Sequence, residues 1–284
     1  MTSATIAVTA ATGHLGRLAI DALKTRMPAG QIAALARDPA KAADLGVEVR
    51  AADYTRPDQL VAALAGISDL VLISSNSFDD RAGQHRNVID AAKAAGVGRI
   101  IYTSILKAKG SAMLLAADHI ATEDMLAASG LAVTLLRNGW YLENLTGSLG
   151  GSIAAGAMIG SAGTGRISAA ARADLAEAIA VVAATPGHAG KIYELAGDSA
   201  FTMAEMAAEV SRLSGKTIPY NSLPPEVYAG ILQGFGLPAG FATILADADV
   251  HAAGGALYEG SGTLSRLIGH PTQTMPAAVA AALA

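Results

Sequence analysis

The sequence predicts an α/β protein: a doubly wound parallel-sheet Rossmann domain with a smaller C-terminal α/β substrate lobe. Over the first 137 residues, short apolar runs alternate with segments of helical periodicity. Because the connections are short, this alternation requires parallel strands joined by right-handed crossovers. The alternation breaks after Arg137. We therefore expect a dinucleotide-binding domain over residues 1–137, to which residues 166–185 return, and a substrate lobe over residues 138–284.

The elements of the first domain follow from the period of the apolar residues. Runs of β-prone residues indicate strands at 6–9, 31–36, 47–50, 70–73, 99–103 and 132–136. Residues 70–73 are apolar throughout, as expected of a strand that is covered on both faces. Apolar residues three and four positions apart indicate helices at 13–23, 40–45, 57–64, 81–95 and 116–128.

The second half of the chain has a different organisation. Residues 147–165 are rich in glycine and alanine, and a helix is expected at 174–184, followed by a strand at 191–195. Another helix is expected at 201–214, before Gly215. Residues 222–283 contain repeated proline and glycine residues, which indicate short helices.

Composition excludes several classes of function. The 284 residues include no cysteine, which rules out disulfides, thiolate metal sites and a cysteine nucleophile, and the scattered histidines suggest no metal site. The net charge of −4 gives no electrostatic reason to expect nucleic acid or an anionic membrane as partner. Apolar runs are far shorter than the ~20 residues that span a bilayer. We expect a cytoplasmic monomer or homodimer that acts on a small molecule.

A phosphate-binding loop is predicted between the first strand and the first helix. Its spacing is that of G-x-x-G-x-x-G with Ala10 at the first position, Gly13 at the second and Gly16 at the third. Gly13 would let a pyrophosphate approach the backbone, and Gly16 would let the helix pack close to the strand. We expect an ordinary negative φ at Ala10, because its Cβ must be tolerated there. The alternative is a simple glycine turn.

The end of the second strand indicates which dinucleotide binds. A guanidinium suits the 2′-phosphate of NADP, and Arg37 stands where NAD-dependent proteins place a carboxylate. NADPH is therefore favoured, although Arg37 could instead form an ion pair with Asp38. After the third strand, Asp53 could accept a hydrogen bond from adenine or could cap a turn; Tyr54 follows it.

The usual proton donor of short-chain dehydrogenases is missing. None of the seven tyrosines has a lysine four positions later, so ordinary exchange between alcohol and ketone is disfavoured. An acceptor whose reduction by hydride gives a stabilised anion needs less help, because that anion takes protons from water. Positioning and a dry pocket then suffice.

The role of His119 remains open on the sequence alone, with three interpretations. His119 shares a helical face with Glu123. His119 could position the nicotinamide ribose or relay a proton near neutral pH. It could also be purely structural, with Glu123 as its partner. His85, Arg86 and Asn87 are expected on the solvated face of their helix.

Several segments together resemble the NmrA-like, atypical short-chain dehydrogenase/reductase family, and within it the bacterial type 2 NADPH:quinone oxidoreductase class. The specific strings are LRNGWY at 136–141 and YELAGD at 193–198. The supporting segments are residues 9–16, 37–39, 53–54, 74–76, 171–174 and 264–271. The resemblance covers nearly the whole chain.

The resemblance implies a role for particular residues in binding NADP(H). The pyrophosphate would be cradled by Ala10, Ala11, Thr12, Gly13, His14 and Leu15, and Arg37 would hold the 2′-phosphate. Ser74, Ser75 and Asn76 would line the nicotinamide-side ribose. The remaining cofactor contacts would come from Asp53, Tyr54, Asn138, Gly139, Tyr141 and Arg172. Trp140 and Asn144 would face the quinone, and His119 lies where relatives place a functional lysine or histidine.

The favoured function is NADPH-dependent hydride transfer to a quinone or a similar flat, conjugated acceptor. One alternative is a regulator that senses NADP(H) without turnover, because NmrA-like proteins include such sensors. Another keeps the enzyme and changes the acceptor to a triphenylmethane dye, an imine or a carbonyl compound.

Overall fold

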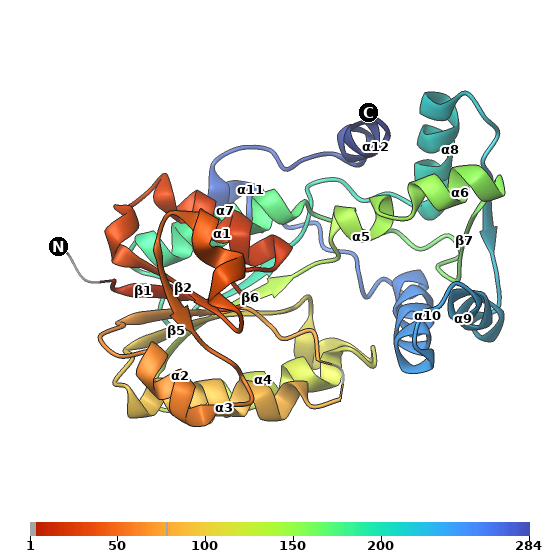
Figure 1. The fold of residues 1–284 in the computed structure, drawn as a ribbon. Coiled ribbons are helices and arrows are strands. Elements are labelled where there is room, and N and C mark those ends of the chain that lie inside the picture. Colours follow the sequence, from red (N-terminus) through yellow and green to blue (C-terminus); the bar gives the residue numbers. More distant parts are fainter. Residues whose placement is uncertain (1–3, 78) are drawn as a thin grey trace. The chain divides into compact units, whose positions relative to one another are not determined.

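The computed structural model describes residues 4–77 and 79–284, which form two compact units (Figure 1). The first unit comprises the described residues up to Ile105, together with Asp118–Asn138 and Arg172–Tyr193. The second comprises Leu106–Ala117, Gly139–Ala171 and Glu194–Ala284. Each unit is described by itself below.

The first unit is built on a parallel sheet. The strands are β1 (Ile6–Val8), β2 (Ile32–Ala36), β3 (Glu48–Ala51), β4 (Asp69–Leu72), β5 (Arg99–Ile105), β6 (Ala132–Asn138) and β8 (Ile192–Leu195). They form one seven-stranded sheet in the order β3-β2-β1-β4-β5-β6-β8, and the pairs from β3 to β6 are parallel. The strand order reverses between β1 and β4, which is where α/β sheets of this kind bind ligands. The predicted doubly wound fold is confirmed.

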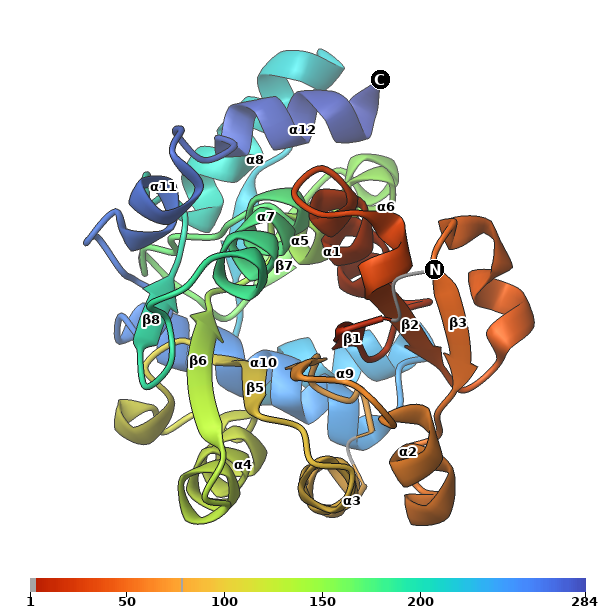
Figure 2. The same ribbon diagram turned by 90° about the vertical axis from the view of Figure 1, so that its left-hand side faces the viewer.

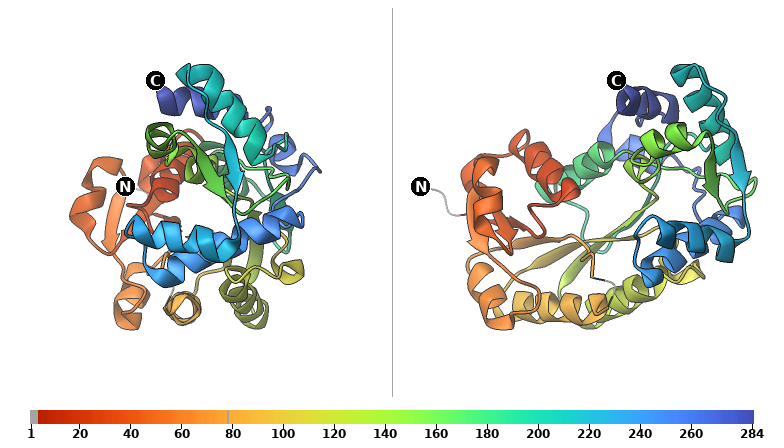
Figure 3. Two further views of the ribbon diagram at one scale, coloured as in Figure 1. Left: turned by 90° about the vertical axis from the view of Figure 1, so that its right-hand side faces the viewer. Right: turned by 45° about the vertical axis from the view of Figure 1, so that its right-hand side comes forward.

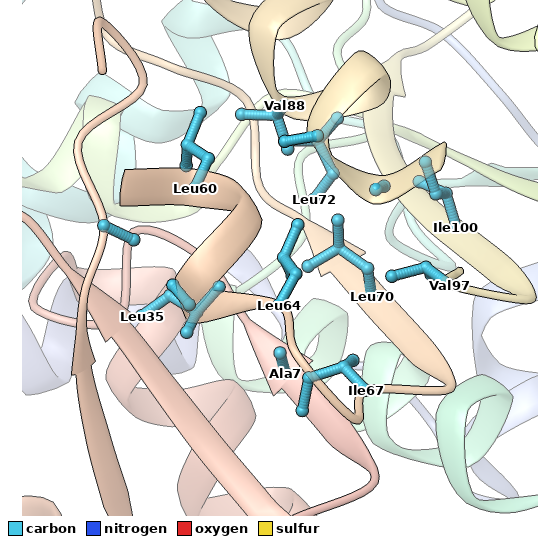
Figure 4. Packing of buried hydrophobic residues seen from close by; sticks show 14 of the residues in the cluster. Ala7, Leu35, Leu60, Leu64, Ile67, Leu70, Leu72, Val88, Val97 and Ile100 are labelled. Atoms are coloured by element: carbon cyan, nitrogen blue, oxygen red, sulfur yellow. The ribbon is translucent and has the colours of Figure 1, made fainter. Parts of the chain in front are cut away.

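Helices cover both faces of this sheet. They are α1 (His14–Lys24), α2 (Pro57–Ala63), α3 (Arg81–Ala94), α4 (Ala116–Ala128) and α7 (Arg172–Ala184). Figure 2 shows α1 and α7 along one face and α2, α3 and α4 along the other. Because side chains alternate along a strand, Leu70 and Leu72 pack toward Leu64, which directly follows α2, and Val88 of α3 (Figure 4). Burial on both faces explains the unbroken apolar run of β4.

Two short 3-10 helices precede and follow β2, namely η1 (Ala29–Gln31) and η2 (Pro39–Leu45), and η3 (Ala108–Gly110) follows β5. The short helix predicted at 40–45 is therefore present, as a 3-10 helix over Pro39–Leu45. Asp38 caps it by accepting from the Ala40 N–H at 3.2 Å. Gly46, with φ of 69°, ends it in the left-handed region.

The second unit contains mainly short helices and one small sheet. Its elements are α5 (Leu142–Thr146), α6 (Leu149–Ala155), β7 (Met158–Gly160), α8 (Met203–Ser214), β9 (Tyr220–Ser222), α9 (Pro225–Gly234), α10 (Ala239–Ala253), α11 (Thr263–Ile268) and α12 (Met275–Leu283). Strands β7 and β9 pair in parallel, and α9 packs against α10 (Figure 3). Across the described residues, every helix is too short or too polar to cross a membrane.

The YELAGD string has a structural explanation in the second unit. The Asp198 carboxylate accepts a hydrogen bond from Ser265 Oγ at 2.6 Å and from the Thr272 N–H at 2.9 Å. Thr272 Oγ1 in turn accepts from the Asp198 N–H at 2.9 Å. Asp198 therefore ties the segment after β8 to the C-terminal segment around α11, and these hydrogen bonds hold its pKa below the ordinary value despite partial desolvation.

Replacing Gly16 by alanine should destabilise the first unit by about 1–3 kcal/mol, the usual cost of overpacking. A Cβ at position 16 would lie 2.3 Å from the Ala10 carbonyl oxygen and 2.9 Å from Ala11 Cα, so backbone must move. Urea unfolding followed by circular dichroism measures the change. The matched control is Gly150→Ala within α6, where the new Cβ meets nothing within 4 Å. An undiminished unfolding midpoint for Gly16→Ala would contradict the close-packing role.

Candidate active site

The predicted phosphate loop is the turn that joins β1 to α1. The Gly13 N–H donates to the Ala10 carbonyl at 2.9 Å, and the Ala11 N–H donates to Leu35 O of β2 at 3.2 Å. Gly13 precedes α1 with extended backbone (φ −77°), and the structure gives α1 no side-chain cap and no acidic residue in its first turn. The N–H groups of this helix end are therefore available to an anion. Thr12 is half-buried, His14 exposed and Leu15 buried.

The expectation of an ordinary φ at Ala10 is wrong. Ala10 has φ of 48°, in the left-handed region that favours glycine. The tight turn to Gly13 requires this conformation whether or not a Cβ is present. Alanine therefore carries at position 10 the strain that glycine would avoid, a cost on the order of 1 kcal/mol. Strain of this kind is characteristic of ligand-binding loops.

Arg37 follows β2 at the carboxyl end of the sheet. Its side chain is exposed and makes no hydrogen bond or ion pair within the described part of the chain. Asp38 instead caps η2 and lies 3.9 Å from Lys41 Nζ, so the alternative of an Arg37–Asp38 pair is not realised. An exposed guanidinium beside the phosphate loop is available for an anionic group.

The residues after β3 have local structural partners. Asp53 Oδ1 accepts from the Thr55 N–H at 2.9 Å and from Thr55 Oγ1 at 2.8 Å. The bond from the Thr55 N–H holds the pKa of Asp53 below its ordinary value, and the charge of Arg37 contributes. Tyr54 Oη donates to the Ile73 carbonyl at 2.9 Å, and burial raises its pKa. Asp53 is thus a turn cap, and Tyr54 supports the end of β4.

The segment after β4 is held by hydrogen bonds to β5 and to α3. The Ser74 N–H donates to Thr103 Oγ1 at 2.9 Å. The Ser75 N–H donates to His85 Nε2 at 2.9 Å, and Ser75 Oγ donates to Gln84 Oε1 at 2.6 Å. Asn76 is exposed. The two serines predicted to bind ribose therefore sit on a rigid loop at the carboxyl end of the sheet.

The interpretation of His85, Arg86 and Asn87 as a solvated face is confirmed for Arg86, which is exposed, and wrong for His85. His85 is completely buried, and Asn87 is half-buried with its Nδ2 donating to Tyr54 O at 2.9 Å. His85 lies on the buried face of α3, whereas Asn87, two positions later, lies on a different side of the helix and contacts the segment after β3. His85 is a functional candidate that the sequence analysis missed.

His119 lies on α4 and is nearly buried, with 7% of its surface exposed. Its Nδ1 and Tyr102 Oη of β5 are 2.8 Å apart and share a hydrogen bond. Burial lowers the pKa of His119 to about 3, with the charge of Arg81 acting in the same direction. The imidazole is therefore neutral near pH 7, which disfavours the expected proton relay.

The alternative in which Glu123 satisfies His119 is also wrong. Glu123 is buried and binds Arg137 of β6 in a two-point ion pair, with distances of 2.9 and 2.6 Å. Ser104 Oγ donates to the same carboxylate at 2.6 Å. Ser104 is thus engaged within the protein.

Asn138 ends β6 with an unsatisfied side chain. It is only 4% exposed, and neither its Oδ1 nor its Nδ2 has a hydrogen-bond partner among the described residues. Leaving such a buried group unpaired costs about 1–3 kcal/mol. A buried carboxamide with a free donor and a free acceptor at the carboxyl end of a central strand therefore indicates a ligand that supplies both partners.

The remaining predicted residues divide between the units. Arg172 begins α7 in the first unit and is half-buried. In the second unit, the Gly139 N–H donates to Leu195 O at 2.7 Å, and a Cβ at Gly139 would lie 3.1 Å from that oxygen. Trp140 and Tyr141 are half-buried, and Asn144 is exposed on the short helix α5.

Comparisons with known proteins agree with this geometry. Residues 10–186 match the profile of a family described as NAD(P)H-binding. Quinone oxidoreductase 2 of Escherichia coli K12 is 52% identical over 277 residues, which is 96% of this chain and 97% of that protein. The crystal structure of the NADPH-dependent quinone oxidoreductase of Escherichia coli with NADPH superposes with a TM-score of 0.96, at 50% identity and 99% and 100% coverage. Triphenylmethane reductase of Citrobacter sp. complexed with NADP(H) gives a TM-score of 0.93, at 37% identity and 98% and 100% coverage.

The buried His119 should make stability depend on pH in a defined direction. Its pKa is about 3 in the folded protein and 6.5 ordinarily, so the unfolded chain binds more protons between these values. The free energy of unfolding should therefore fall as pH drops below 6.5. His119→Gln should reduce this slope near pH 5 by up to ~1.4 kcal/mol per pH unit.

Urea titrations of both proteins at several pH values measure this effect. Above pH 7 the two profiles should run parallel, because the histidine is neutral in both states there. An identical slope near pH 5 in the variant would show that His119 is not buried in the neutral form.

Proposed function

Because the chain belongs to the NAD(P)H-binding family, we propose that it is an NADPH-dependent oxidoreductase that transfers a hydride to a quinone or a similar flat, conjugated acceptor. The observation that carries this proposal is its similarity, over nearly the full length of both chains, to a quinone oxidoreductase. The free guanidinium of Arg37 and the unpaired carboxamide of Asn138 support it from the structure.

The residues of the first unit fit a phosphorylated dinucleotide. The uncapped start of α1 and the left-handed turn at Ala10 would hold the pyrophosphate. Arg37 would bind the 2′-phosphate, and the carboxamide of Asn138 would pair with the amide of the nicotinamide. When bound, NADPH supplies the hydride.

The cofactor contacts assigned by resemblance are proposed along the carboxyl ends of the strands. Ser74, Ser75 and Asn76 follow β4 and would contact the nicotinamide-side ribose, and Asp53 and Tyr54 follow β3. The loop residues Ala11, Thr12, Gly13, His14 and Leu15 precede or begin α1, and Gly139, Tyr141 and Arg172 complete the set. Asp53 keeps Oδ2 for adenine while Oδ1 caps its turn.

The acceptor side depends on positioning rather than on a protein acid. Trp140 supplies a flat face for stacking and Asn144 an amide donor, and both are proposed to contact the acceptor. His119 is proposed to position the nicotinamide ribose in its neutral form, because an imidazole with a pKa of about 3 carries no proton to deliver near pH 7. A quinone suits such a site, since its reduced oxygens take protons from water.

A second candidate acceptor is a triphenylmethane dye, favoured by the similarity to the Citrobacter reductase. It shares with quinones an electron-poor, conjugated π-system that accepts a hydride without an acid. We further propose that the protein is a cytoplasmic monomer or homodimer that acts on this small-molecule substrate. Cell fractionation and light scattering test those two points.

The activity is tested with purified protein, NADPH or NADH, and a panel of benzoquinones, naphthoquinones and one triphenylmethane dye. We expect quinone-dependent loss of absorbance of the reduced cofactor, faster with NADPH. Turnover of the dye alone would favour the second acceptor. Tight NADPH binding without any turnover would instead indicate a sensor of NADP(H).

Arg37→Ala should raise the KM for NADPH by tenfold or more and leave the KM for NADH nearly unchanged. A charge-assisted contact to phosphate is worth about 1.5–3 kcal/mol, and NADH lacks the phosphate. Steady-state kinetics with both cofactors measure the effect. Lys41→Ala is the matched control, since Lys41 is exposed near the same strand end and lies beside Asp38. Equal increases in both KM values would refute the role of Arg37.

A further inference from the structure

Helix α3 holds the loop after β4 through three side chains that converge on Ser75. Arg81 Nε donates to the Ser75 carbonyl at 2.8 Å, and Gln84 Oε1 accepts from Ser75 Oγ at 2.6 Å. His85 Nε2 accepts from the Ser75 N–H at 2.9 Å. Residues 81, 84 and 85 share one helical face, so a single rigid element fixes both backbone polar groups of Ser75.

The hydrogen bonds of His85 determine its tautomer. A backbone N–H can only donate, so Nε2 carries no proton, and in the neutral ring the proton is on Nδ1. Nδ1 lies 2.9 Å from Thr122 Oγ1, which already donates its own proton to the Asp118 carbonyl at 2.7 Å. Thr122 Oγ1 therefore accepts the hydrogen bond from His85 Nδ1. Each donor in this series of hydrogen bonds, from Ser75 to Asp118, then has an acceptor.

The surroundings keep this imidazole neutral and fixed in orientation. His85 is completely buried, and burial lowers its pKa to about 3, with the charge of Arg81 adding to the effect. The ring of Tyr102 meets it edge to face at a centroid distance of 5.5 Å, and that of Tyr54 at 6.3 Å. Rotation of the ring would break both hydrogen bonds.

We propose that His85 is a positioning residue for the nicotinamide half of the cofactor, acting through the Ser75 N–H. The proposal rests on the function proposed above, in which residues 74–76 contact the nicotinamide-side ribose. The neutral imidazole bridges this loop to Thr122 on α4, so the loop is held in its binding conformation before the cofactor arrives. Preorganisation of this kind raises affinity by removing the cost of ordering the loop.

The test compares two ligands that share the adenine half. His85→Phe keeps an aromatic ring between Tyr54 and Tyr102 and removes both hydrogen bonds. By calorimetry, its affinity for NADPH should fall about tenfold, the equivalent of one lost hydrogen bond. Its affinity for adenosine 2′,5′-bisphosphate, which lacks the nicotinamide half, should not change. Arg86→Ala, an exposed neighbour on α3, is the control and should change neither affinity.

The tautomer supplies a second, independent readout. Thr122→Val removes the acceptor of the His85 proton and should also weaken NADPH selectively, whereas Thr122→Ser should restore the affinity. Nitrogen NMR of the histidine-labelled protein should show His85 with its proton on Nδ1. These measurements keep the inference testable if His85→Phe does not fold.

Two results would overturn the inference: equal loss of affinity for both ligands, or a His85 that carries its proton on Nε2. Failure of the proposed function is distinguishable, because the affinities are measured without an acceptor. A wild-type protein that binds NADPH and reduces no quinone or dye would refute the oxidoreductase and leave the role of His85 supported by binding alone.

Discussion

The candidate cofactor site depends on the close approach of α1 to the turn that follows β1. At Gly16 the helix backbone comes so near the Ala10 carbonyl that no side chain fits between them. This contact fixes the start of α1 close to the turn that follows β1, in which Ala10 has left-handed backbone. The free N–H groups of the helix consequently lie at the carboxyl edge of the sheet. Parallel pairing then brings the ends of β2, β4 and β6 to that same edge.

The sequence predicted this frame because its signals are local and periodic. The apolar run of β4, the helical spacing after Gly13 and the glycine at 16 each constrain one element or one contact. Other features lay beyond such signals. The φ of Ala10 is set by the hydrogen bond between Gly13 and Ala10, which residue type alone does not reveal. Strands β7 and β9, each three residues long, have no period to detect.

Buried polar residues were the main source of wrong interpretations. Helical spacing shows that His119 and Glu123 share a face, but it does not show which strand lies opposite. In the structure, His119 forms a hydrogen bond with Tyr102 of β5. Glu123 instead forms an ion pair with Arg137 of the neighbouring strand β6. For His85 the signal was present, because Val88, Ile89 and Ala92 place it on the apolar face of α3. The expectation of a solvated His85 came from the polarity of its side chain, although its position in the helical pattern indicated burial.

The protonation states in the first unit constrain the chemistry more than the residue types do. Both buried histidines are held neutral by burial and by the charge of Arg81, and Glu123 is already paired with a cation. Near neutral pH the histidines can orient groups through hydrogen bonds, but neither stores a proton for the acceptor. A site of this kind favours acceptors whose reduced form is stable as an anion until water protonates it. The proposed preference for flat, conjugated acceptors would thus follow from the neutral state of these two histidines and the pairing of Glu123, as much as from any aromatic side chain that stacks on the acceptor.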